Sequence, residues 1–131
     1  MTRTRTQPIA PGVLKARQFI DRHFARDLTI DRLATMANLS TFHFIRAFRA
    51  AFGQTPHQYL RQQRLARAKE LLVTTPQPVT EICDQIGFQS LGSFSSLFRR
   101  MTGETPAGFR AKRRKNVYIP GCFVRMYRAD R

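Results

Sequence analysis

Apolar residues recur every three or four positions in several short segments of the chain, and polar or proline-containing breaks separate the segments. This spacing places the apolar side chains on one face of an α-helix. A first amphipathic helix is predicted from Val13 onward. A second, short helix is expected after Thr29, a residue type that caps helices, and it ends near Asn38, which tolerates the left-handed backbone conformation. We therefore predict an all-α fold.

The third predicted helix follows Ser40 and carries a stripe of large aromatic residues on one face. The stripe consists of Phe44, Phe48 and Phe52. We expect it to be buried, which leaves the opposite face of the helix free for other contacts. Gly53 ends this helix, and a cap followed by proline starts a longer helix over residues 56–74.

The second half of the chain repeats the first, at an offset of 49 residues that becomes 50 after one insertion near Gln89 or Ser90. The aligned pairs include Leu33 with Ile82, Ala34 with Cys83, Ala37 with Ile86, Phe44 with Phe94, Phe48 with Phe98, Gly53 with Gly103 and Tyr59 with Phe109. Each copy has a short helix, a tight turn and a second helix with one buried and one exposed face. This is the helix-turn-helix pattern, present twice.

The repeat divides the chain into five parts. A basic N-terminal arm over residues 1–10 precedes a first helix-turn-helix subdomain over 11–55, a linker helix over 56–74, a second subdomain over 75–115 and an apolar and basic tail over 116–131. A disordered tail rarely keeps so many apolar residues, so we expect this tail to dock. It can pack back onto the second subdomain, or it can contact a second chain in a dimer.

Positive charge dominates the chain, with 23 Lys and Arg against 8 Asp and Glu and a formal net charge of +15. No acidic residue lies between Asp31 and Glu70, so the charged side chains of this stretch create a uniformly positive electrostatic field. Such an excess disfavours a compact state unless a polyanion binds, and nucleic acid is the polyanion that we predict. The sequence lacks an 18-residue apolar run, a signal-peptide core and a lipidation motif, so we expect no membrane association and a cytoplasmic location.

The residue types that carry catalysis or bind metals form no recognisable arrangement. Cys83 and Cys122 lack the spacing of a zinc site, and the three histidines are scattered. We find no nucleophile with a base, no pair of carboxylates and no phosphate-binding loop. We therefore predict that the protein is not an enzyme and that it has no metal and no cofactor.

An ordered set of short motifs resembles the DNA-binding domain of the AraC/XylS family of bacterial regulators, over about Val13 to Arg113. The motifs are Leu33-Ala34, Phe48-Arg49, Phe52-Gly53, Thr55-Pro56, Ala68-Lys69-Glu70-Leu71-Leu72, Ile86-Gly87-Phe88, Phe94, Phe98 and Gly103-Glu104-Thr105-Pro106. Each motif alone is weak, but the ordered set, repeated in tandem, is highly specific.

The resemblance implies a transcription regulator whose all-α domain has seven helices. A long central helix joins two helix-turn-helix subdomains, and each subdomain offers a recognition helix to the major groove of double-stranded DNA. Short standalone members of the family are the most similar in organisation, which implies binding as a monomer and contact with RNA polymerase. We expect the cytoplasmic protein to be associated with the nucleoid when it is bound to DNA.

The first recognition helix presents the residues that we expect to read base edges. They are Thr41, Phe42, Ile45 and Arg46. Arg46 can donate two hydrogen bonds to guanine O6 and N7, and Phe42 or Ile45 can pack on thymine methyl groups. The family has an aromatic residue and an arginine at the positions of Phe42 and Arg46. The alternative is that Phe42 belongs to the core and Arg46 is only solvated.

The second recognition helix departs from the family pattern. Its base-facing positions hold Leu91, Gly92 and Ser96, where relatives often carry Gln or Arg, so we expect the first helix to dominate base readout. Its inward face is expected to consist of Phe94, Leu97, Phe98 and Met101. Contacts to phosphate are expected from Ser40, Arg49, Thr55, Ser90, Ser95, Arg99, Arg100 and Thr105.

The length of the central helix suits this interpretation. A helix of about 19 residues spans roughly 28 Å, and successive major grooves on one face of B-DNA lie about 34 Å apart, so one monomer can reach both if the DNA bends modestly. A non-specific architectural protein is the alternative, because it would show the same electrostatics. RNA is less expected, since the exposed aromatic residues stand on helices and not on a sheet.

Overall fold

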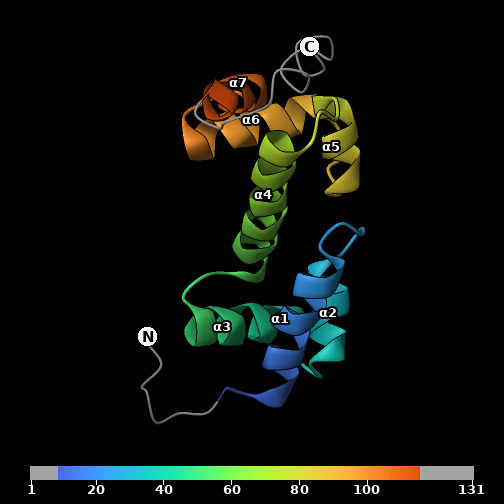
Figure 1. Ribbon diagram of the computed structural model, residues 1–131. Helices are drawn as coiled ribbons and strands as arrows, with labels where there is room; N and C mark the ends of the chain where they lie inside the picture. The colour runs from blue at the N-terminus through green and yellow to red at the C-terminus, as the bar shows by residue number, and fades with distance from the viewer. Residues whose placement is uncertain (1–8, 116–131) are drawn as a thin grey trace. The chain divides into compact units, whose positions relative to one another are not determined.

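The computed structural model describes residues 9–115, and this part of the chain contains seven α-helices and no strand (Figure 1). The helices are α1 (Pro11–His23), α2 (Ile30–Met36), α3 (Thr41–Phe52), α4 (Pro56–Thr74), α5 (Val79–Gln85), α6 (Leu91–Thr102) and α7 (Pro106–Lys115). The predicted all-α fold with two helix-turn-helix units is confirmed. Most of the predicted N-terminal arm, and the tail over 116–131, lie outside the described residues.

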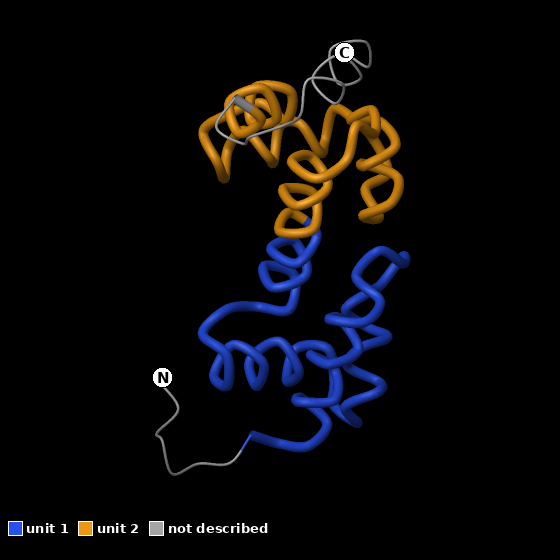
Figure 2. The backbone as a smooth tube through the Cα atoms, viewed as in Figure 1, with its two compact units in different colours: residues 1–64 blue, residues 65–131 orange. Residues whose placement is uncertain are grey.

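The chain forms two compact units, residues 1–64 and residues 65–131, and the boundary between them falls inside α4 (Figure 2). Each unit has a core of its own. The buried residues of the first unit are Val13, Ala16, Ile20, Leu33, Ala34, Ala37, Phe44, Phe48 and Leu60. Those of the second are Leu65, Ala68, Leu71, Leu72, Ile82, Cys83, Ile86, Phe94, Leu97, Phe98 and Phe109.

The turns between the paired helices have the conformations that the sequence predicts. Asn38 has a φ of 59° and Gly87 has a φ of 90°, so both adopt the left-handed conformation that ends α2 and α5. The Thr29 hydroxyl accepts a hydrogen bond from the backbone N–H of Arg32 at 3.2 Å and caps α2. Contacts between residues close in the sequence therefore set the C-terminal ends of both short helices and cap the start of α2.

Arginine side chains bind backbone carbonyls at or just beyond the ends of α1 and α4. In the first unit, Arg64 donates from Nε to the Phe24 carbonyl at 2.7 Å and from Nη2 to the Arg26 carbonyl at 2.9 Å. In the second unit, Arg110 donates to the carbonyls of Leu72 and Thr75 at 3.0 and 3.1 Å. Carbonyls at a helix end have no partner within the helix, so both arginines satisfy groups that would otherwise need water.

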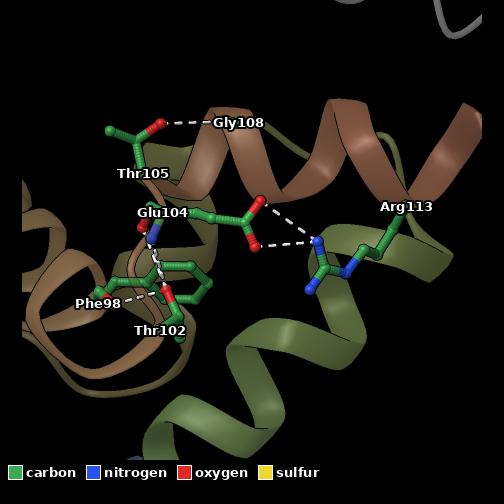
Figure 3. Close-up of polar contacts among 6 residues, drawn as sticks. All are labelled: Phe98, Thr102, Glu104, Thr105, Gly108 and Arg113. Carbon is green, nitrogen blue, oxygen red and sulfur yellow. Dashed lines mark hydrogen bonds and ion pairs between the residues drawn. The ribbon is translucent and has the colours of Figure 1, made fainter.

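The start of α7 is fixed by polar contacts in the second unit (Figure 3). Arg113 forms an ion pair with Glu104 at 2.9 Å, and its guanidinium lies 4.1 Å from the centre of the Phe109 ring. The Thr105 hydroxyl accepts from the Gly108 N–H at 3.0 Å and caps the helix. These contacts hold α7 against the end of α6, and they use an acidic residue that the family motif places there.

Met101 does not lie where its periodicity predicts. The sequence places it on the inward face of α6 with Phe94 and Leu97, yet 48% of its surface is exposed. Periodicity fixes the angle of a residue around the helix, but it does not show whether another element extends far enough to cover it. Met101 lies in the last turn of α6, where the buried stripe has ended.

Replacing Phe48 or Phe98 by alanine is expected to lower the free energy of unfolding of its unit by about 3 to 5 kcal/mol, because each change leaves a cavity in a small core. Both side chains are fully buried. Phe42→Ala is the matched control, since its ring is 70% exposed and its loss should change stability by less than about 0.5 kcal/mol. Urea and thermal unfolding, followed by circular dichroism, measure the effect. Wild-type stability in both core variants would show that the helix faces are reversed.

Candidate nucleic-acid interface

Helix α3 presents an aromatic ring and a guanidinium side by side. Burial of Phe44 and Phe48 turns the opposite face of the helix outward. On that face the Phe42 ring is 70% exposed, and the Arg46 guanidinium lies 5.5 Å from its centre, within the range of a cation–π interaction. The alternative in which Phe42 belongs to the core is wrong. Covering an exposed aromatic ring with a partner lowers the free energy, because it removes apolar surface from water.

The other predicted residues of α3 are less exposed or lie farther along the helix. Thr41 and Ile45 are half-buried, whereas Arg49 is exposed in the last turn. The Thr41 hydroxyl donates a hydrogen bond to Asp31 Oδ1 at 2.5 Å. Sequence reasoning missed Asp31, because nothing in the spacing of the sequence marks it as a partner of Thr41, ten residues later.

Helix α6 presents small and apolar residues at its start and cations at its end. Leu91 is 43% exposed, Gly92 and Ser96 are exposed, and Ser95 is half-buried. A Cβ atom built on Gly92 would meet no atom within 4 Å, so the fold itself does not require glycine there. Two exposed cations follow in the last turn, Arg99 and Arg100.

Four predicted helix caps are present. The hydroxyls of Ser40, Thr55, Ser90 and Thr105 accept from backbone N–H groups three residues later, at 3.1, 3.2, 3.1 and 3.0 Å. Each hydroxyl accepts in its cap and still has a proton to donate. A phosphate oxygen beside such a helix start would also meet the positive end of the helix dipole.

The electrostatics of both recognition helices have one sign. Neither α3 nor α6 contains an acidic residue. Within residues 9–115, the ion pairs between Arg or Lys and an acid are Arg67 with Glu70 and Arg113 with Glu104, and none involves an arginine of α3 or α6. Within the described residues, no acidic side chain therefore competes with an anionic partner for these arginines.

Cys83 is buried at the turn between α5 and α6. Its Sγ is 3.5 Å from the Ser90 carbonyl oxygen, and burial raises the pKa of the thiol above its ordinary value. The protonated thiol is a weak nucleophile and acts as a packing group.

Among residues 9–115, no three His, Cys, Asp or Glu side chains gather as metal ligands. No helix of this part of the chain is both long and apolar enough to cross a membrane.

Two helix-turn-helix units with exposed, cationic recognition helices define the class of this protein, a DNA-binding helix-turn-helix protein. A family model described as a helix-turn-helix domain matches residues 33–112. The regulatory protein SoxS of Salmonella typhimurium is 37% identical over 93 residues, which are 71% of this chain and 87% of SoxS. The chain therefore belongs to the AraC family of transcription regulators, and the resemblance stated from its motifs is confirmed.

Other relatives share the domain within longer proteins. AdaA of Bacillus subtilis, a bifunctional transcriptional activator and DNA repair enzyme, is 34% identical over 93 residues, and the chain spans 44% of its length. The chain spans 37% of LumQ from Photobacterium leiognathi.

Solved structures of the family have the same fold. The DNA-binding domain of AdpA in complex with a target DNA has a TM-score of 0.77 and 31% identity, over 80% of this chain and 95% of that domain. The C-terminal domain of AraT from Geobacillus stearothermophilus has a TM-score of 0.75 and 29% identity, over 88% of this chain and 93% of that domain.

Binding of double-stranded DNA is expected to weaken steeply with salt, because arginines and lysines that neutralise phosphates release counterions. The logarithm of the binding constant should fall with the logarithm of salt concentration at a slope that corresponds to about 6 to 10 released counterions. Fluorescence anisotropy titrations of a labelled duplex at stepped KCl concentrations measure the slope. A slope near zero would exclude phosphate contacts as the main source of affinity.

Proposed function

We propose that this protein regulates transcription by reading one DNA half-site mainly through α3, while α6 mainly holds the backbone of the adjacent half-site. The single observation that carries the proposal is the difference between the two outward faces. The α3 face places the exposed Phe42 ring beside the Arg46 guanidinium, and the early turns of α6 carry no cation.

The chemistry of α3 favours direct readout. Arg46 lies in the N-terminal half of α3, the part of a recognition helix that contacts base edges, and its fork of donors matches guanine O6 and N7. Phe42 and Ile45 supply apolar surface for thymine methyl groups, with Thr41 beside them at the start of the helix. Arg49, about one helical turn beyond Arg46, is proposed to contact a phosphate of the DNA backbone.

The chemistry of α6 favours close approach and backbone contact. Glycine is a poor helix former, yet Gly92 lies in the first turn of α6, and the packing around it leaves open space for a side chain. A small surface at Gly92 and Ser96 lets the helix backbone come near the DNA. Leu91 can cover apolar atoms in the groove, and Arg99 and Arg100 can neutralise phosphates. The hydroxyls of the cap residue Ser90 and of Ser95 can donate hydrogen bonds to phosphate oxygens.

The whole protein is proposed to act as a monomer in the cytoplasm, associated with the nucleoid when it is bound to DNA. Support comes from α4, one continuous helix of 19 residues that contributes to both cores, and from the likeness to SoxS over most of the length of SoxS. Contact with RNA polymerase is proposed from the same likeness. A non-specific architectural role is the other candidate, because the electrostatics alone do not require specificity.

The ratio of specific to random-sequence binding decides between these two functions. A site is first selected from a random DNA library, and its dissociation constant is then compared with that of random duplex at one salt concentration. A regulator should prefer the selected site by about 10³ or more, whereas an architectural protein should show a ratio close to one.

Three alanine variants test how the two helices divide the work. Arg46→Ala should cost about 1 to 3 kcal/mol on the selected site and relax the preference at one base pair. Arg99→Ala should weaken all sequences alike and lower the salt slope by about one. Ser96→Ala, at the position equivalent to Arg46, is the matched control and should change little.

Titrations on the selected site and on each of its single base-pair variants supply the measurement. The assignment of roles is wrong if Arg46→Ala leaves specificity intact and the sharpest base preferences depend on Leu91 to Ser96 instead.

A further inference from the structure

A carboxylate lies beside the start of the first recognition helix. Asp31, in the first turn of α2, is exposed, and its Oδ1 accepts the Thr41 hydroxyl at 2.5 Å. Thr41 is the first residue of α3 and is half-buried. The recognition helices carry no acid of their own, so Asp31 brings a negative charge to a surface that otherwise attracts phosphate.

The hydrogen bond decides which part of Thr41 can meet DNA. A hydroxyl has one proton, and here that proton is donated to Asp31, so Thr41 has no donor left for a base edge. The threonine side chain occupies few rotamers because it branches at Cβ. With the hydroxyl turned toward α2, the methyl group occupies a different staggered position and remains as the apolar part of the side chain.

We propose that Asp31 is a positioning residue for DNA recognition. It fixes Thr41 so that the Thr41 methyl group packs on the C5-methyl group of a thymine in the half-site bound by α3. This inference rests on the proposed function, in which α3 reads bases. It adds that Thr41 recognises thymine by apolar contact and not by its hydroxyl, and that a residue outside the recognition helix controls this contact.

Comparison of the two repeats shows that the Asp31–Thr41 hydrogen bond is specific to the first unit. The position equivalent to Asp31 is Thr80, and the position equivalent to Thr41 is Leu91. Leu91 is 43% exposed and has no hydroxyl to be held, so the second unit cannot form the same pair. The pair therefore belongs to the unit whose recognition helix also carries Phe42 and Arg46.

Uracil substitution isolates the proposed contact, because it removes only the C5-methyl group of thymine. Each thymine of the selected site is replaced singly, and the thymine-to-uracil ratio of dissociation constants is measured. The Arg46→Ala data show which half-site lies under α3. For the wild-type protein we expect a loss of about fourfold at one thymine of that half-site, the value of one buried methyl group.

Substitutions of Thr41 separate its methyl group from its hydroxyl. Thr41→Ser keeps the hydroxyl and removes the methyl group, so uracil should no longer weaken binding at that position. Thr41→Val keeps a methyl group at Cβ without needing the hydrogen bond, so the fourfold preference for thymine should remain. The opposite result, preference kept by serine and lost by valine, would show that the hydroxyl makes the contact.

Substitutions of Asp31 test whether it acts through Thr41. Asp31→Ala frees the hydroxyl and should reduce the thymine preference, whereas Asp31→Asn keeps an acceptor and should retain it. In the double variant Asp31→Ala with Thr41→Val the preference should return, because valine does not depend on the acceptor. Glu81→Ala is the matched control, since it also removes one exposed charge from the first turn of a short helix.

The outcomes separate this inference from the proposed function. A selected-to-random ratio near one for the wild type contradicts the proposed function itself. A high ratio with no uracil effect in the α3 half-site, or an Asp31→Ala variant with the full wild-type preference for thymine, overturns only the role of Asp31. Thermal unfolding of every variant checks that the first unit is folded. The double variant and Asp31→Ala both lack the Asp31 carboxylate, so a difference in thymine preference between them cannot come from the lost charge.

Discussion

Pairs of phenylalanines one helical turn apart determine the rest of this structure. The rings of Phe44 and Phe48 lie 5.8 Å apart, and those of Phe94 and Phe98 lie 5.7 Å apart, and all four are fully buried. Each unit is small, so a few large aromatic side chains supply a large share of its buried apolar surface. Their burial fixes the rotation of α3 and α6 about their axes, and that rotation decides which residues face a partner.

Local chemistry made most of the fold predictable from the sequence. The stripe of α3, the hydroxyl caps such as Ser40 and the left-handed residues such as Asn38 each act within a few positions of the chain. Contacts between distant residues could not be predicted in the same way. Arg64 binds the carbonyls of Phe24 and Arg26, 40 and 38 positions away, and no periodicity in the sequence marks it.

The candidate site was predictable in its positions but not in its bonding. Sequence reasoning placed Phe42 and Arg46 on the outward face, and the structure adds that the ring and the guanidinium contact each other. The sequence predicts Thr41 as a residue that reads bases, yet the Thr41 hydroxyl donates a hydrogen bond to Asp31, ten residues earlier. That pairing depends on how α2 packs against α3, and composition and spacing carry no information about such packing.

The duplicated core explains how the two recognition helices can differ. Because the same aromatic stripe anchors α3 and α6, each helix keeps its fold whatever its outward residues are, and those residues can change at little cost in stability. Gly92 shows this freedom directly, since nothing packs over it. The equivalent positions of α3 carry large side chains where α6 has Gly92 and Ser96: the exposed ring of Phe42 and the long cationic side chain of Arg46. One scaffold thus supports a surface with side chains for base edges and a surface that lets the backbone approach.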